Sequence, residues 1–269
     1  VQDHERKFLP QQSAIETAQD WDTLQPFTMQ EDFIVRQVEL TKKIMQQMKG
    51  KAVVLATVHG LVASAYHTLG GVDLYDHDGT ILGRHLRENP KGMHHALDVL
   101  TDYLQKLCQL FLDAGVDGNY FASLGGERRM FTDEEFAEFI APREIEIMKS
   151  IERVPCFNIL HMCKSDLNLE RYKDYPADVL NWGVFEDNIS LEEGRALFGA
   201  DKVYLGGMDD RDGVIVDGTL DEIRQTAQGV VDGFGWKKFI LGADCTLPTN
   251  LPAERMHAVA EGTVISQKG

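Results

Sequence analysis

Residues 157–164 read Phe-Asn-Ile-Leu-His-Met-Cys-Lys, an apolar run that ends in two potential metal ligands. Within Phe157–His161 only Asn158 interrupts the apolar residues before His161, and the segment does not alternate strictly between apolar and polar residues. Such a short, nearly continuous run is typical of a strand that is buried on both faces of a parallel sheet. Similar runs recur along the chain, and we expect further strands at Ala52–Thr57, Val116–Phe121, Val179–Trp182, Val203–Leu205 and Phe239–Leu241.

Longer amphipathic stretches separate these runs. A Ser or Thr followed three residues later by Glu marks a helix start, because both side chains can accept from unpaired backbone amides there. This pattern begins at Thr28, Thr132, Ser190 and Thr219, and Met93–Ala114 carries an apolar stripe at helical spacing. Strands that alternate with helices predict an α/β fold with parallel strands. We expect one domain over residues 1–269, since no linker-like segment divides the chain.

The periodicity alone leaves open whether the sheet is doubly wound or closed into a barrel. No strand is followed by the Gly-x-Gly-x-x-Gly turn of dinucleotide-binding folds, which disfavours that class. The pattern predicts six strands, so an eight-stranded barrel would have two further strands outside this chain.

The composition restricts the class of function. The chain has 27 Lys and Arg against 43 Asp and Glu, a formal net charge of −16. Such a surface repels phosphate backbones and anionic lipids, so we expect neither a nucleic-acid partner nor a membrane role. The first residues are polar and charged, unlike a secretory segment, and four scattered cysteines do not form a disulfide framework. A reducing, cytoplasmic location fits best.

Two strand ends carry potential metal ligands. His161 and Cys163 lie two residues apart, and extended backbone places both side chains on the same side. Cys245 follows the last predicted strand, and closure of a barrel would bring it to the same rim. One imidazole and two thiolates leave a fourth position open, as in catalytic zinc sites. The alternative is that these residues are buried core side chains, since cysteine and histidine are often found there.

Other polar residues near strand ends could contact a substrate. His59, Glu127, Arg128 and Asp209 each follow a predicted strand within a few residues. Arg128 could bind an anionic group and Asp209 could hydrogen-bond a substrate or a metal-bound imidazole. A solvated loop explains Arg128 equally well, and a turn or helix cap explains Asp209 equally well.

Several segments together resemble the uroporphyrinogen decarboxylase superfamily. Ile159–Cys163 is similar to the Leu-His-x-Cys strand of its zinc-dependent methylcobamide methyltransferases, and Phe239–Arg255 is similar to their last strand and ligand loop. Tyr204–Asp210 resembles the superfamily's Gly-Asn-Leu-Asp strand end. Gly118–Ser123 and the segment from Phe131 resemble its fourth strand and helix.

The resemblance extends from about Ala18 to Gly262 and implies a (β/α)8 TIM barrel of which strands 3–8 are present, often as a homodimer. It implies zinc at His161, Cys163 and Cys245. Tyr66 is similar to the active-site tyrosine of the decarboxylase branch, and Ser123 to the serine after its fourth strand. The Arg-Gln-Ala-Gly-Arg signature of the decarboxylases is absent from this sequence.

The resemblance implies zinc-dependent methyl transfer between a methylated corrinoid and a thiol or similar acceptor. A corrinoid protein would then be the expected partner, with a small-molecule methyl donor or acceptor. One alternative is decarboxylation of a uroporphyrinogen-like tetrapyrrole, which needs no metal. Another is a corrinoid- or tetrapyrrole-binding module without catalytic activity.

Overall fold

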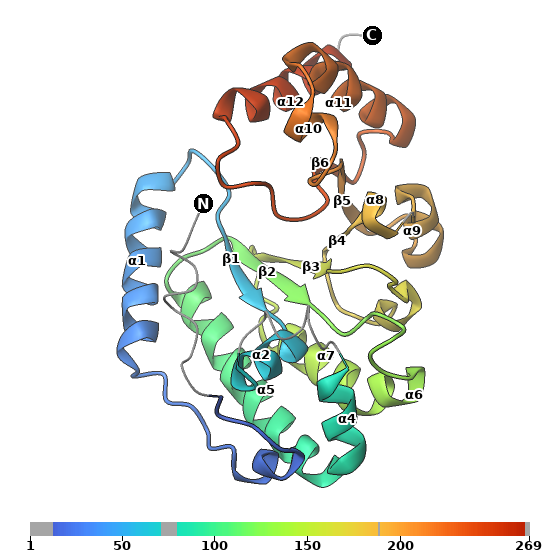
Figure 1. Cartoon of the computed structure of the whole chain (residues 1–269). Coiled ribbons are helices and arrows are strands. Elements are labelled where there is room, and N and C mark those ends of the chain that lie inside the picture. Colours follow the sequence, from blue (N-terminus) through green and yellow to red (C-terminus); the bar gives the residue numbers. More distant parts are fainter. Residues whose placement is uncertain (1–12, 71–79, 188, 267–269) are drawn as a thin grey trace.

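A computed structural model describes residues 13–70, 80–187 and 189–266 of the chain. Six parallel strands form one sheet in the sequential order β1-β2-β3-β4-β5-β6 (Figure 1). A doubly wound sheet reverses its strand order at a switch point, whereas a barrel adds each strand beside the previous one. The sequential order therefore confirms the predicted barrel type, with six consecutive strands present. The strands are Leu55–His59, Gly118–Ser123, Phe157–Met162, Val179–Trp182, Val203–Met208 and Phe239–Ala243.

Helices connect successive strands, as parallel pairing requires. In Figure 1, α1 lies beside β1 at one margin of the sheet, and α10, α11 and α12 lie beside β6 at the other. Between these two margins lies α5, the longest of the described helices, and one face of it is buried along its length. The α-helices are α1 Asp32–Met48, α2 Leu61–Thr68, α4 Ile81–Glu88, α5 Pro90–Asp113, α6 Asp133–Glu135, α7 Ala141–Ser150, α8 Val184–Asp187, α9 Leu191–Phe198, α10 Val214–Asp217, α11 Leu220–Phe234 and α12 Ala253–Ser266. The described residues also form short 3-10 turns at Ala18–Thr23 and Leu169–Tyr172 and a π-helical turn at Phe136–Ile140.

Three of the four predicted capping boxes are present. Thr132, Ser190 and Thr219 each accept from the amide of the Glu three residues later, and each Glu reaches back to the cap. The prediction at Thr28 was wrong, because α1 begins at Asp32 with Glu31 before it. The Thr28 hydroxyl instead accepts from the Gln30 amide and stabilises the turn that precedes the helix.

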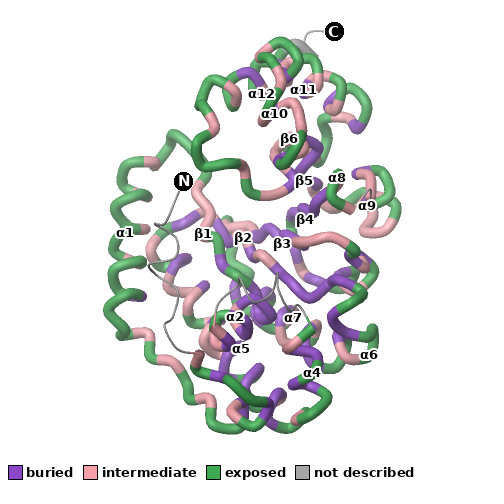
Figure 2. Tube along the Cα trace, in the orientation of Figure 1, coloured by how far each residue is buried: buried purple, intermediate pink, exposed green. Residues whose placement is uncertain are grey.

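The hydrophobic core lies between the sheet and the helices that cover it. Figure 2 shows the middle strands β2 to β5 largely buried and α5 buried along one face, whereas β1 and β6 are only partly buried and α1 is exposed along most of its length. Most of the core is one cluster that includes Trp21, Tyr66, Phe121 and Trp182, and a smaller cluster joins β5 to α10, α11 and α12. No helix in the described ranges is long and apolar enough to cross a membrane.

Several strands extend further toward their carboxyl ends than predicted. β1 begins at Leu55 and continues to His59, and β2 continues to Ser123. β5 includes Gly206 and Gly207, whose partners on β6 are Leu241 and Gly242. Glycine and polar residues have low strand propensity, so the strands predicted from apolar residues alone ended before the observed strands do. The additional residues are those at the rim where barrel enzymes carry their active sites.

Candidate metal centre

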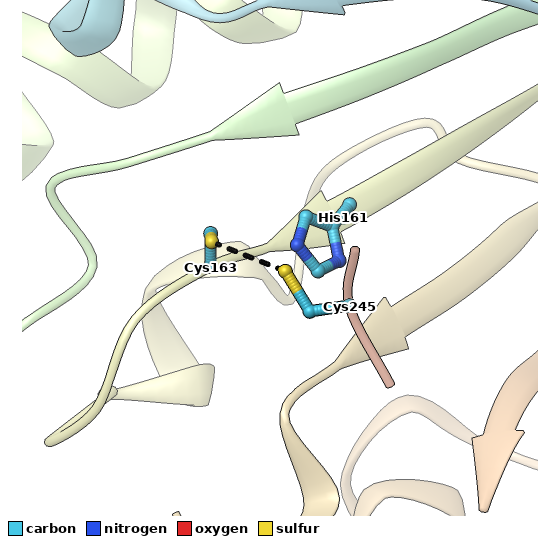
Figure 3. Close-up of side chains that lie close together, drawn as sticks. All are labelled: His161, Cys163 and Cys245. Atoms are coloured by element: carbon cyan, nitrogen blue, oxygen red, sulfur yellow. Dashed lines mark hydrogen bonds between the residues drawn. The ribbon is translucent and has the colours of Figure 1, made fainter. Parts of the chain in front are cut away.

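His161, Cys163 and Cys245 converge at the carboxyl-end rim of the sheet. His161 is in β3, Cys163 is the first residue after it, and Cys245 lies two residues beyond β6 (Figure 3). One potential ligand atom from each residue lies within 4.8 Å of the other two. His161 is buried, and the two cysteines are half-buried. The structure thus brings together the three residues that the sequence selected as candidate metal ligands.

The spacing of the two sulfur atoms provides a test of the zinc hypothesis. Cys163 Sγ and Cys245 Sγ lie 3.8 Å apart, far beyond a disulfide bond, and both cysteines are free. Two sulfurs bound to one tetrahedral zinc at about 2.3 Å each would lie about 3.8 Å from one another. The two cysteines and the imidazole therefore fit a tetrahedral zinc and leave its fourth position for another ligand.

The two cysteines share a hydrogen bond. The Cys163 thiol donating to Cys245 lowers the pKa of Cys245 and raises the pKa of Cys163, and burial raises the pKa of Cys163 further. His161 also stabilises the Cys245 thiolate and lowers the pKa of Cys245. Cys245 therefore loses its proton readily, and thiolate is the form of cysteine that binds metals.

Asp244 fixes the loop that carries Cys245. Its Oδ1 accepts from the Gly207 amide at 2.7 Å, and its Oδ2 accepts from the Phe185 amide at 3.2 Å. Its own amide donates to the Met208 carbonyl. Burial raises the pKa of the Asp244 carboxyl to about 7. These bonds attach the loop after β6 to β5 and α8, and so determine where the Cys245 sulfur lies.

The register of the sheet places His59 in the same row as His161. His59 pairs with Ala122, Ala122 with His161, and His161 with Asn181. Residues in register on parallel strands share a face, and His59 is two strands, or about 10 Å, from His161. The His59 ring stacks on His67, with Nδ1 and Nε2 3.3 Å apart. It lines a mainly apolar cavity of about 1000 Å³ that also borders α1, α2 and α5.

Asp209 stabilises a turn, which is the alternative role that the sequence left open for this residue. Its Oδ1 accepts from the Arg211 amide at 2.9 Å and from the Asp212 amide at 3.4 Å. The turn brings the Arg211 guanidinium to the metal centre, where Nη2 lies 3.9 Å from Cys245 Sγ. Asp209 therefore shapes the loop beside the site.

Ser123 and Tyr66 are enclosed in the core. Tyr66 on α2 has no exposed surface. Ser123 is likewise fully buried, and its hydroxyl donates to Glu144 Oε2 at 2.7 Å. Glu144 also accepts from the Leu61 amide and from the Tyr175 hydroxyl, and burial raises the pKa of Glu144 to about 7.

Glu127 and Arg128 lie in the loop after β2. Glu127 is fully buried, its Oε2 accepts from the Gly125 amide, and burial raises the pKa of its carboxyl to about 7. Its Oε1 has no hydrogen-bond partner, and the nearest cation is Arg129, with Nη2 3.8 Å away. Arg128 donates to the Leu167 carbonyl at 2.6 Å and pairs with Asp166. Arg128 thus holds two loops together, and Glu127 has a buried oxygen without a hydrogen-bond partner among the described residues.

Two buried polar residues, Asn181 and Glu144, and the half-buried Tyr120 were not predicted from the sequence, although each had a signal. Asn181 interrupts the apolar run Val179–Trp182, and a polar residue in a strand buried on both faces needs a specific partner. Tyr120 lies on the face of β2 that points toward His161. Glu144 shares the buried face of α7 with Ile147 and Met148, three and four residues later.

The fold is shared with solved structures of two kinds of enzyme. A methyltransferase from Methanosarcina mazei matches with a TM-score of 0.74 and 17% identity, over 88% of this chain and 66% of that protein. A B12-independent methionine synthase from Shewanella sp. W3-18-1 matches with a TM-score of 0.58 and 15% identity, over 86% of this chain and 66% of the synthase. The chain therefore spans just under two thirds of the length of each. At these identities the likeness shows the fold alone.

The sequence itself identifies the family. No sequence among the curated proteins is similar enough to match the chain. The sequence model for uroporphyrinogen decarboxylase (URO-D), in contrast, matches residues 6–263, nearly the whole chain. With six sequential parallel strands of a barrel and a match over this length, the chain belongs to the uroporphyrinogen decarboxylase (URO-D) family.

Proposed function

We propose that this chain carries the zinc site of a methyltransferase that transfers a methyl group between a methylated corrinoid and a thiol or similar acceptor. The observation that carries the proposal is the 3.8 Å separation of the Cys163 and Cys245 sulfurs beside His161. The fold shared with a methyltransferase and a methionine synthase supports the same reaction class.

His161, Cys163 and Cys245 would hold the metal. When bound there, zinc would lower the pKa of an acceptor thiol, so that the thiol is a nucleophile at neutral pH. Two thiolate ligands donate more charge than two neutral ligands would, which keeps the acceptor sulfur reactive. Asp244 would keep Cys245 in position through its bonds to Gly207 and Phe185.

The methyl donor would approach from the rim where the three ligands meet. A corrinoid on a partner protein would have to present its methyl group there, because the acceptor would be held at that rim. The decarboxylation alternative would use pocket groups such as Tyr66 and an aspartate, and Tyr66, like Ser123, is enclosed in the core. We therefore propose methyl transfer as the activity and leave the acceptor to experiment.

Demethylation of methylcobalamin by a panel of thiols tests the proposal. We expect activity with at least one thiol, loss of that activity on zinc removal, and recovery when zinc is added back. Cys245→Ala should be inactive, whereas Cys156→Ser should keep the activity, since Cys156 precedes β3 outside the candidate metal centre and its thiol donates to the Val116 carbonyl at 3.7 Å. Activity that does not depend on zinc would contradict the mechanism.

A further inference from the structure

We propose that Asn181 is a positioning residue that fixes the tautomer and the orientation of His161, and so leaves His161 Nε2 as the nitrogen that binds the metal. The functional importance of this inference rests on the proposed zinc site. The tautomer itself follows from contacts within the chain.

The orientation of the Asn181 side-chain amide follows from a backbone group. Its Nδ2 lies 2.9 Å from the Leu205 carbonyl oxygen. A carbonyl oxygen can only accept a hydrogen bond, so the amide nitrogen must face Leu205. Oδ1 must then point to the opposite side of the amide, toward His161.

That orientation determines which nitrogen of His161 carries the proton. His161 Nδ1 lies 2.6 Å from Asn181 Oδ1. Because an amide oxygen has no proton to donate, Nδ1 must be the donor. A neutral imidazole carries one proton, so Nε2 keeps the free electron pair that a metal requires. A partner that holds the second nitrogen of a metal-binding histidine in this way is a general feature of metal sites.

Tyr120 completes the arrangement. Its hydroxyl lies 2.6 Å from the same Asn181 oxygen, and its ring stacks on His161 with centroids 5.3 Å apart. An amide oxygen has two acceptor sites, and the two donors fill them. Rotation of the Asn181 amide would therefore break three hydrogen bonds at once.

Burial makes these bonds costly to break. Asn181 has no exposed surface, and His161 is only 3% exposed. A polar group left without a partner in such a site costs about 1–3 kcal/mol, and water cannot replace the lost partner. The ring of His161 is thus held by its strand, by the stack on Tyr120 and by Asn181.

Two variants separate a positioning role from a purely structural one. Asn181→Leu has a similar size but no acceptor, and Asn181→Asp keeps an acceptor for the His161 proton. We expect the zinc affinity, measured by competition with a chromophoric chelator, to fall about 10–100-fold in Asn181→Leu. In Asn181→Asp, which keeps the acceptor for His161 but loses the donor to Leu205, and in Tyr120→Phe the affinity should fall less than in Asn181→Leu. Equal affinities in wild type and Asn181→Leu would overturn the inference.

The protonation of Nδ1 can also be measured without any metal. Long-range ¹H–¹⁵N correlation of the zinc-free wild type shows whether His161 Nδ1 carries a proton, with its signals assigned by their absence in His161→Gln. We expect a protonated Nδ1, because Nδ1 faces the Asn181 oxygen whether or not Nε2 also donates to Cys245. An unprotonated Nδ1 would overturn the inference even if zinc binds. Failure of the wild type to bind zinc would instead overturn the proposed function and leave the tautomer result intact.

Discussion

The Sγ atoms of Cys163 and Cys245 lie 3.8 Å apart, although 82 residues separate the two cysteines in the sequence. They follow β3 and β6, which are three strands apart in the sheet. In a flat sheet, strand spacing of about 4.8 Å would separate these strands by about 14 Å. The contact therefore reflects curvature of the sheet, which brings the two strand ends toward a common interior. The barrel geometry, and not proximity in sequence, assembles the candidate metal centre.

Removing the Asp244 carboxylate should loosen the loop that carries Cys245. Asp244→Ala leaves the amides of Gly207 and Phe185 without their acceptor, at about 1–3 kcal/mol for the buried Gly207 amide and less for the partly exposed Phe185 amide. We expect a loss of about 2–4 kcal/mol in the free energy of unfolding of the zinc-free protein, measured by urea denaturation. Asp244→Asn, which keeps one acceptor oxygen, should lose less. A loss below about 0.5 kcal/mol in Asp244→Ala would show that the loop does not depend on these bonds.

Ionisation of Glu144 should make the protein less stable as the pH rises. Burial raises the pKa of Glu144 to about 7 in the folded chain, from an ordinary value of 4.5. Its contribution to stability is then complete below pH 4.5 and is lost as the pH rises through 7. Glu144→Gln cannot ionise. We therefore expect the free energy of unfolding of Glu144→Gln, relative to that of the wild type, to increase by on the order of 1–3 kcal/mol between pH 5 and pH 8.

The control for this titration is Glu146→Gln on the exposed side of the same helix. Its stability relative to wild type should change little between the same two pH values. If Glu144→Gln and Glu146→Gln respond to pH alike, Glu144 is not the group that titrates.

Replacing Arg171 should destabilise the loop that contains Glu127 and Arg128. Its Nη1 donates to the carbonyls of Gly125, Gly126 and Glu127, and its Nη2 donates to that of Phe131. The side chain is 5% exposed. Lysine cannot reproduce this planar set of donors, so Arg171→Lys should lose about 2–4 kcal/mol of unfolding free energy in urea denaturation.

Arg128→Lys is the matched comparison, because the Arg128 side chain is 56% exposed. We expect a loss below about 1 kcal/mol for that variant. Similar losses in the two variants would mean that burial of Arg171 adds nothing to the stability of the loop.

The sequence predicted much of the fold because parallel strands leave a clear pattern. Strands buried on both faces appear as continuous apolar runs, and Val179–Trp182 was predicted with its observed bounds. The ends of β2 and β5 were missed because Ser123, Gly206 and Gly207 lack strand propensity. Pairing with neighbouring strands keeps them extended, and a single sequence does not contain that information.

The candidate site was predicted unevenly for a similar reason. His161, Cys163 and Cys245 could be selected by residue type and by their places at strand ends, since metal ligands are few in kind. The roles of Asn181 and Glu144 depend on which buried donors face them, and this emerges only when distant segments pack. Ser123 illustrates the difference, because its place after a strand suggested an active-site role and packing enclosed it beside Glu144.

The most direct measurement is zinc content combined with zinc-edge X-ray absorption of the purified protein. We predict about one zinc per chain, with two sulfurs at about 2.3 Å and one imidazole nitrogen at about 2.0 Å among its neighbours. Cys245→Ala should lose most of the zinc, and Cys156→Ser should keep it. A wild-type protein that binds no zinc after purification and zinc addition, or one whose zinc has no sulfur neighbours, would contradict the account.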